Sequence, residues 1–132
     1  MKRIKNQKGF TLVEIMIVVA IIALLAAIAI PNLLRAKMSA NDALAKATLR
    51  SLSTASESYA TAYSGNYPTD ETSLTGATPP YLNSSYCGRI LSGFIITCNQ
   101  FSNSYTFTAT PNTPGTSGTQ TFTITTGGVL TP

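Results

Sequence analysis

Few side chains in this sequence could do chemistry, and the most informative of them is a single carboxylate, Glu14. It lies in the run from Phe10 to Ile30, which is otherwise apolar except for Thr11. About 21 residues at ~1.5 Å each span roughly 31 Å, which is the thickness of a hydrocarbon core. A carboxylate inside such a run costs about 2.5–3.5 kcal/mol on insertion scales. We therefore expect Glu14 to have a partner, since a plain membrane anchor has no use for it.

The two cysteines, Cys87 and Cys98, are the other candidates for chemistry. The chain has no His, the usual base of a catalytic thiol, and two thiols without His or nearby acids make a poor metal site. No catalytic residue, metal site or cofactor is therefore predicted. Beyond a membrane segment, in an oxidising compartment, an isolated pair favours a disulfide. Closing a loop of about 12 residues contributes roughly 3 kcal/mol in the chain-entropy model.

The charge of the chain is concentrated at its beginning. The net charge is +4, and Lys2, Arg3, Lys5 and Lys8 account for all of it. Basic residues before an apolar run hold the N-terminus in the cytoplasm. The remaining residues carry equal numbers of cations and acids. The basic isoelectric point therefore predicts no binding to nucleic acid.

The stretch from Lys8 to Glu14 reads KGFTLVE and closely resembles the type III signal sequence of type IV pilins and pseudopilins. The match continues through FTLVEIMIVVAIIALLAAIAIP. The resemblance implies that a prepilin peptidase cleaves between Gly9 and Phe10 and methylates the new amine of Phe10. It also implies that Glu14 neutralises the Phe10 amine of a neighbouring subunit during assembly, and that Pro31 bends the helix.

Two simpler interpretations of this segment are possible. A secretory signal peptide would be cleaved near the small residues of Ala27-Ile28-Ala29, but its apolar region is only 7–15 residues long. An uncleaved anchor would have the right length. Neither interpretation explains Glu14.

One long helix is expected to run from the apolar segment to about Tyr63. Pro31 kinks a helix more often than it ends one, and no Gly or Pro follows until Gly65. One stripe at helical spacing is expected to pack on the rest of the chain: Leu44, Thr48, Leu52, Ala55, Tyr59 and Tyr63. Three charged residues are expected to lie off that stripe: Lys46, Arg50 and Glu57.

The remainder of the chain predicts a loop followed by a small sheet. Gly65 is placed to cap the helix, and residues 66–92 are interrupted by Pro and Gly, with a turn or short strand near Tyr81-Leu82 as the only expected element. Residues 94–97 are a short run of β-forming residues, and apolar and Thr residues then alternate with period two in residues 105–110 and 121–125. Gly127-Gly128 predicts a hairpin to a last strand.

The expected fold class is α+β: a long N-terminal helix packed on a small antiparallel sheet of three or four strands, which is the type IV pilin layout. Five segments are predicted: a leader that is removed (1–9), an apolar assembly helix (10–31), an amphipathic helix (32–63), a connecting loop (64–92) and a sheet with the disulfide (93–132).

The resemblance implies a structural subunit, and no enzyme, that polymerises with its own copies into type IV pilus filaments for adhesion, motility or related functions. Its expected partners are the prepilin peptidase, the inner-membrane assembly machinery and, before assembly, the membrane itself. The expected location is the inner membrane for the precursor and the cell exterior for the filament.

Three alternatives within or near the family are open. A type II secretion pseudopilin carries a calcium site made by acidic loop residues, and no acid follows Glu71 here. A minor pilin fits the same pattern as a major one. A membrane-anchored DNA-uptake receptor would need a basic patch, and the sheet region offers only Arg89.

Overall fold

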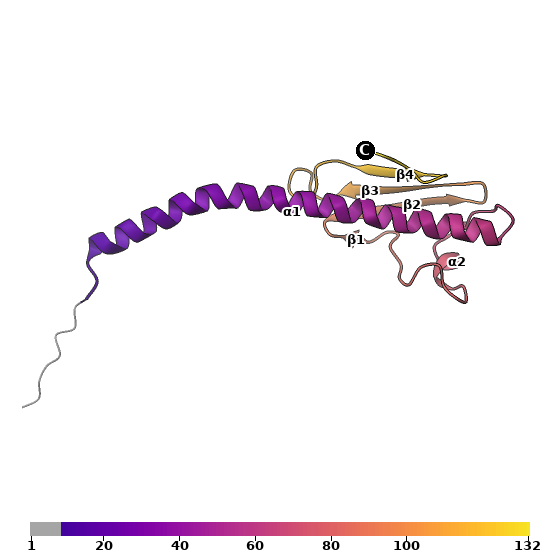
Figure 1. Cartoon of the computed structure of the whole chain (residues 1–132), viewed down its shortest axis with the longest axis horizontal. Helices are drawn as coiled ribbons and strands as arrows, with labels where there is room; N and C mark the ends of the chain where they lie inside the picture. Colours follow the sequence, from indigo (N-terminus) through magenta and orange to yellow (C-terminus); the bar gives the residue numbers. More distant parts are fainter. Residues whose placement is uncertain (1–8) are drawn as a thin grey trace, which may run out of the picture. The chain divides into compact units, whose positions relative to one another are not determined.

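The computed structural model describes residues 9–132, and its elements belong to the predicted α+β class (Figure 1). The elements in chain order are α1 (Leu12–Ala62), α2 (Thr72–Thr75), β1 (Ile90–Leu91), β2 (Phe94–Phe101), β3 (Ser104–Pro111), β4 (Phe122–Thr125) and β5 (Val129–Thr131). The chain divides into two compact units, one ending at Arg35 and the other covering Ala36–Pro132. The basic residues 1–8 lie outside the described residues.

Helix α1 is 51 residues long and includes Pro31. It therefore continues through the proline, as the absence of other helix breakers predicts. It ends where Ser64 and Gly65 take positive φ values of 57° and 87°. The Gly65 N–H then bonds to the Ala60 carbonyl oxygen at 2.8 Å, which satisfies a carbonyl that the helix itself leaves unpaired. Gly65 is the capping residue that the sequence predicts.

The first unit consists of helix with almost no cover. Every residue from Gly9 to Arg35 is exposed except Ala26, which is half-buried. By its length and composition this helix could cross a membrane, and its most apolar stretch is not buried by any other part of the described chain. The apolar side chains of this unit therefore gain almost none of the tens of kcal/mol that burying them away from water would provide.

The second unit is a five-stranded sheet, in the order β1-β2-β3-β4-β5, packed on the second half of α1 (Figure 1). All neighbouring strands are antiparallel. The inner face of the sheet carries the largest buried side chains, among them Phe94, Tyr105 and Phe107. On the outer face Thr97, Thr108 and Thr123 stand opposite one another on successive strands. The predicted alternation of apolar and Thr residues is thus the alternation of the two faces.

The sheet and the connector differ from the prediction in detail. The sheet has five strands and not three or four, because the two-residue strand β1 pairs with the start of β2. Both β1 and α2 lie in the segment predicted as an irregular loop. No strand forms at Tyr81-Leu82; instead, the two N–H groups bond to the Leu74 carbonyl oxygen at 2.9 and 3.2 Å. Elements of two and four residues are too short to show a period.

The buried face of α1 also differs from the predicted stripe. Leu44 is 52% exposed and Tyr63 is 49% exposed, although both were expected to pack inward. The buried residues are instead Asn41, Ala45, Leu49, Leu52, Ser53, Ala55, Ser56 and Ala60. Most of these side chains are small, and small residues let the sheet approach the helix closely. A stripe defined by large apolar residues therefore misplaces the contact.

A loop between β3 and β4 is fastened to the start of this buried face. Asn41 Nδ2 donates to the Ser117 carbonyl oxygen at 2.7 Å, and the Asp42 carboxylate accepts from the Thr119 N–H at 3.1 Å and its hydroxyl at 2.6 Å. A Cβ at Gly118 would lie 2.2 Å from Phe94 Cζ. Only glycine therefore allows the loop to pass this close to the Phe94 ring.

Glu57 joins the helix to the sheet, although it was expected to lie off the packed stripe. Its Oε1 accepts from the Tyr105 hydroxyl at 2.8 Å and from the Gly127 N–H at 2.9 Å. Its Oε2 accepts from the Tyr67 hydroxyl at 3.0 Å. The Tyr105 hydroxyl also lies 2.7 Å from Ser53 Oγ, and because the tyrosine proton goes to Glu57, the serine is the donor there. Buried polar groups of the interface are thereby satisfied together.

These contacts shift two pKa values. Partial burial raises the pKa of Glu57, but the hydrogen bonds from Tyr105, Gly127 and Tyr67 outweigh it and leave the pKa below its ordinary value. Burial, assisted by the hydrogen bond to the Glu57 carboxylate and by its charge, raises the pKa of Tyr105 to about 12. Glu57 therefore stabilises the fold only while it is ionised.

We predict that Glu57→Ala lowers the free energy of unfolding by about 1–3 kcal/mol, because Tyr105 loses a charged acceptor at a buried position. Ser58→Ala, at the next and exposed position, is the matched control and should change it by less than about 0.5 kcal/mol. Urea unfolding of the full chain in detergent, followed by circular dichroism, measures both. Equal stability of the two variants would contradict the role given to Glu57.

The pH dependence follows from the lowered pKa of Glu57. Its contribution is complete above the ordinary glutamate pKa of about 4.3 and is lost as the pH falls through the lower folded-state value. Between about pH 5 and 3 the wild type should therefore lose stability more steeply than Glu57→Gln, which has no charge to lose. Parallel curves for the two proteins would show that the pKa of Glu57 is the same in the folded and unfolded chains.

Candidate functional site

The candidate site is the exposed N-terminal end of α1, where the chain folds into a capping box. Thr11 is the residue before the first helical residue, and its hydroxyl accepts from the Glu14 N–H at 3.2 Å. In return Glu14 Oε2 accepts from the Thr11 N–H and the Thr11 hydroxyl, both at 2.8 Å. This reciprocal pairing satisfies helix N–H groups that have no partner within the helix.

The capping box gives Glu14 a partner, while its expected pairing with a neighbouring subunit stays a prediction. The carboxylate has a partner in its own chain, and it lies in the first turn of α1, where the helix dipole favours negative charge. The spacing T-x-x-E before an apolar run is a known helix-start signal, so the sequence contained this information. However, both bonds go to Oε2, and within residues 9–132 no hydrogen bond reaches Oε1. One oxygen therefore remains available to a donor from elsewhere.

Gly9 and Phe10 come just before Thr11 in the chain, and both are exposed. Phe10 is 86% exposed, and a Cβ built on Gly9 would have no atom within 4 Å. The fold itself therefore does not require glycine at position 9. The requirement for a small residue, if there is one, comes from something that acts on this peptide bond.

Pro31 is remote from the other predicted site residues. Gly9, Phe10 and Glu14 lie within one turn of each other at the helix start, whereas Pro31 is exposed and lies about 25 Å further along the helix axis. The side chains near it are also exposed and include Ala23, Ala27 and Ala29. Such small residues permit close approach of a second helix.

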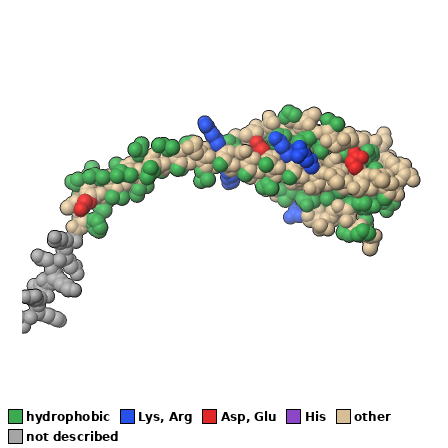
Figure 2. All heavy atoms as spheres, viewed as in Figure 1, with side chains coloured by type: hydrophobic (Ala, Val, Ile, Leu, Met, Phe, Trp, Pro, Cys, Tyr) green, Lys and Arg blue, Asp and Glu red, His purple; other side chains and the backbone are tan. Residues whose placement is uncertain are grey.

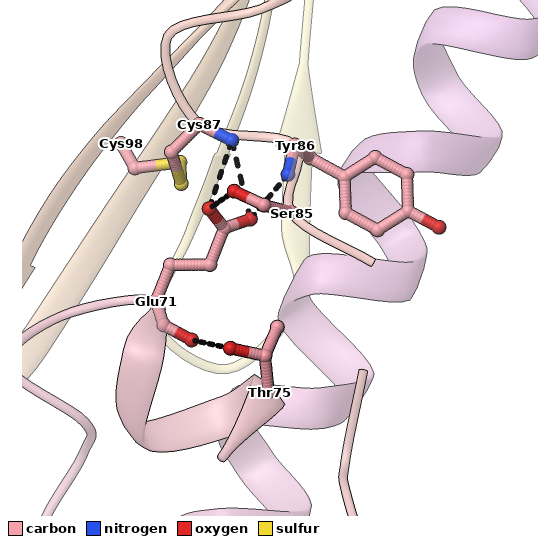
Figure 3. The surroundings of a disulfide bond; sticks show 6 residues. All are labelled: Glu71, Thr75, Ser85, Tyr86, Cys87 and Cys98. Carbon is pink, nitrogen blue, oxygen red and sulfur yellow. Dashed lines mark hydrogen bonds between the residues drawn. A yellow bond between two sulfur atoms is a disulfide. The ribbon is translucent and has the colours of Figure 1, made fainter. Parts of the chain in front are cut away.

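The disulfide forms a separate structural site in the second unit. Cys87 and Cys98 are bonded as predicted, with their Cα atoms 5.6 Å apart. The Glu71 carboxylate lies next to the bond and accepts from the Ser85 hydroxyl, the Tyr86 N–H and the Cys87 N–H (Figure 3). The two Glu71 oxygens lie 3.1 and 3.2 Å from the Cys87 nitrogen. The connector is thus tied to β2 covalently and to the start of α2 by a carboxylate.

Comparisons with known proteins concern mainly the N-terminal part. Residues 4–30 match the family model described as the prokaryotic N-terminal methylation motif. The type IV wide pilus major component PilA4 of Thermus thermophilus is 60% identical over 45 residues, 34% of each chain. The type IV major pilin protein PilA of Myxococcus xanthus is 52% identical over 54 residues, 41% of this chain and 24% of that protein.

A protein of a secretion system is also similar to part of this chain. The type II secretion system core protein G of Vibrio cholerae is 41% identical over 59 residues, 45% of this chain and 40% of that protein. The matched part thus spans less than half the length of each of these relatives. No solved structure matches the chain. The expected resemblance to type IV pilins is confirmed, and the residues that the family model matches include the capping box.

We predict that alkylation of the exported protein without reductant labels neither cysteine, because both are in the bond that the structure shows. Reduction followed by alkylation should label both. Cys87→Ser/Cys98→Ser should lower the free energy of unfolding by about 3 kcal/mol in the chain-entropy model. Full labelling before reduction would mean that the bond is absent in the cell and that Glu71 alone holds the connector.

Proposed function

We propose that this chain is a type IV pilin, a structural subunit that polymerises into pilus filaments on the bacterial surface. The observation that carries the proposal is the bare helix of residues 10–34, which is joined to a folded unit with its own core. Such a helix must be covered by lipid or by other copies of itself. Two relatives are named as pilins, and the N-terminal methylation motif matches residues 4–30, most of that helix segment.

Processing would prepare the helix for assembly. A prepilin peptidase would cut the exposed bond between Gly9 and Phe10 and methylate the Phe10 amine, and the match to the N-terminal methylation motif supports this. Removing residues 1–9 takes away the basic leader that holds the N-terminus in the cytoplasm. The product would begin with a positive amine one turn before Glu14.

Assembly would then use the free oxygen of Glu14. The Phe10 amine of one subunit would bind Glu14 Oε1 of its neighbour while Oε2 keeps its bonds to Thr11. Both charges are costly in an apolar bundle, and pairing removes most of that cost. A subunit in the wrong axial register leaves both unpaired, so the pair selects the register. Pro31 weakens the helix locally and would allow it to bend within the filament.

The second unit would form the outside of the filament. We infer a structural rather than a catalytic role for it, since the sequence has no His and, within residues 9–132, no group of three or more Cys, Asp or Glu side chains could hold a metal ion. The precursor would reside in the inner membrane, in contact with the assembly machinery, and the polymer outside the cell. The runner-up is a type II secretion pseudopilin, which the match to core protein G supports. The closed disulfide and the lack of acids after Glu71 favour the pilus.

We predict that the mature chain begins at Phe10 with a methylated amine. Mass spectrometry of the N-terminal peptide, taken from membranes and from sheared surface material, measures this. Gly9→Val should leave the leader in place, whereas Gly9→Ala, which stays small, should be processed. A mature N-terminus at Met1, or one after Ala29, would rule the proposal out.

We predict that Glu14→Gln is processed and folded but yields few filaments, because glutamine can still accept the bond from Thr11 yet carries no charge for the neighbouring amine. Thr11→Ala is the matched control: it loses the threonine hydroxyl from the capping box, keeps the charge, and should assemble. The measurement is the ratio of sheared filament to total mature subunit. The reverse result, with Glu14→Gln assembling and Thr11→Ala failing, would show that Glu14 serves only as a helix cap.

A further inference from the structure

The carboxylates of this protein are satisfied without cations. Within residues 9–132 each of them accepts hydrogen bonds from hydroxyl or backbone N–H groups, and no hydrogen bond to one comes from Lys or Arg. The carboxylates are Glu14, Asp42, Glu57, Asp70 and Glu71. A folded chain that carries cations but pairs none of them with its acids has charge left for intermolecular contacts.

The Lys and Arg side chains differ in the contacts that they make within the chain. Lys and Arg side chains gather on the outward surface of α1 in the second unit (Figure 2). Lys46 Nζ lies 4.6 Å from the centroid of the Phe122 ring, a cation–π contact. Arg89 donates to the Ser85 carbonyl oxygen at 3.1 Å. Arg50 is exposed and makes no hydrogen bond within the described part of the chain.

Arg50 also lies where a group from another molecule can reach it. It lines a groove of about 450 Å³ between α1 and the connector, together with Tyr81 and Tyr86. No carboxylate lines this groove. A guanidinium beside aromatic and hydroxyl groups, with no acid of its own, is suited to an incoming carboxylate.

Asp70 is the matching group, in the turn that precedes α2. It is the only carboxylate of residues 36–132 that is exposed and not half-buried. Its three hydrogen bonds, from the Thr72 hydroxyl and from the Ser73 N–H and hydroxyl, all go to Oδ1. Within the described residues Oδ2 has no partner, so the carboxylate is fixed in orientation with one oxygen directed to solvent.

We propose that Arg50 of one copy binds Asp70 of another copy in the polymer. This inference rests on the proposed function, since it needs copies of the chain side by side. The two groups are different residues, so the contact can form head to tail, with Arg50 of each copy on Asp70 of the next, and such a contact repeats without closing, as a helical filament requires. No charged side chain follows Arg89 in the sequence.

Charge reversal tests the pair. Arg50→Glu and Asp70→Lys should each reduce sheared filament yield about tenfold, because each places like charges face to face. The double variant, with both reversals in every copy, should restore the yield to within about twofold of wild type. Lys37→Glu, the same kind of reversal on the same helix, is the matched control and should assemble in nearly wild-type amount.

Two further measurements separate this contact from folding. Asp70→Asn keeps an oxygen for the Ser73 N–H and removes the charge, so it should lower the yield while the melting temperature of the detergent-solubilised subunit is unchanged. A double variant that assembles no better than either single variant would overturn the pairing. If cells that express the wild-type chain make filaments in that experiment, the proposed function stands even when the pairing fails. If those cells make no filaments, both the pairing and the proposed function are overturned.

Discussion

The structure depends on one constraint: the first half of α1 is apolar on every side and has no cover from its own chain. Burying it is worth tens of kcal/mol, whereas a typical folded domain is stable by only 5–15 kcal/mol. Nothing that the second unit does could compensate for leaving this helix in water. Its surroundings must therefore supply the cover, and in the proposed function these are first lipid and then other copies. The capping box at its start makes this possible, since it satisfies the helix end without using any group outside the chain.

The second unit has the opposite character. Its core is complete, and its polar groups are paired at three places where distant segments meet: Glu57 with the tyrosines of the sheet, Asp42 with Thr119, and Glu71 with the backbone next to the disulfide. Each uses a carboxylate to hold neutral donors. Because none of these carboxylates accepts a hydrogen bond from Lys or Arg within residues 9–132, the cations of α1 remain available for the contact proposed above, although residues 10–132 carry equal numbers of cations and acids.

Much of this was predictable from the sequence, for identifiable physical reasons. The long helix follows from the absence of helix breakers, and its end follows from the Gly65 signal, with both Ser64 and Gly65 left-handed. The strands β3 and β4 follow from period-two alternation, which marks a half-buried sheet, whereas β2 follows from a run of β-forming residues and β5 from the Gly127-Gly128 hairpin signal. The disulfide follows from an isolated pair of cysteines. The KGFTLVE motif pointed to the family, and the comparisons confirm that resemblance.

What the sequence could not supply depends on contacts between distant residues. Glu57 was expected to face solvent because a charge usually does, and only the positions of Tyr67, Tyr105 and Gly127 explain its place in the interface. The buried face of α1 was misplaced because Ser53, Ser56 and Ala60 pack well only against a sheet that comes close. Strand β1 and helix α2 are too short to have a periodic pattern. The capping box, by contrast, was readable in the spacing of Thr11 and Glu14.

The most direct test of the account is a helical reconstruction, by electron cryomicroscopy, of filaments sheared from cells that express this chain. The account predicts filaments made of this subunit, with residues 10–35 bundled at the filament axis and residues 36–132 on the outside. It is contradicted if the cells make no such filament and the mature chain stays in the membrane, or if the apolar helix lies on the filament surface.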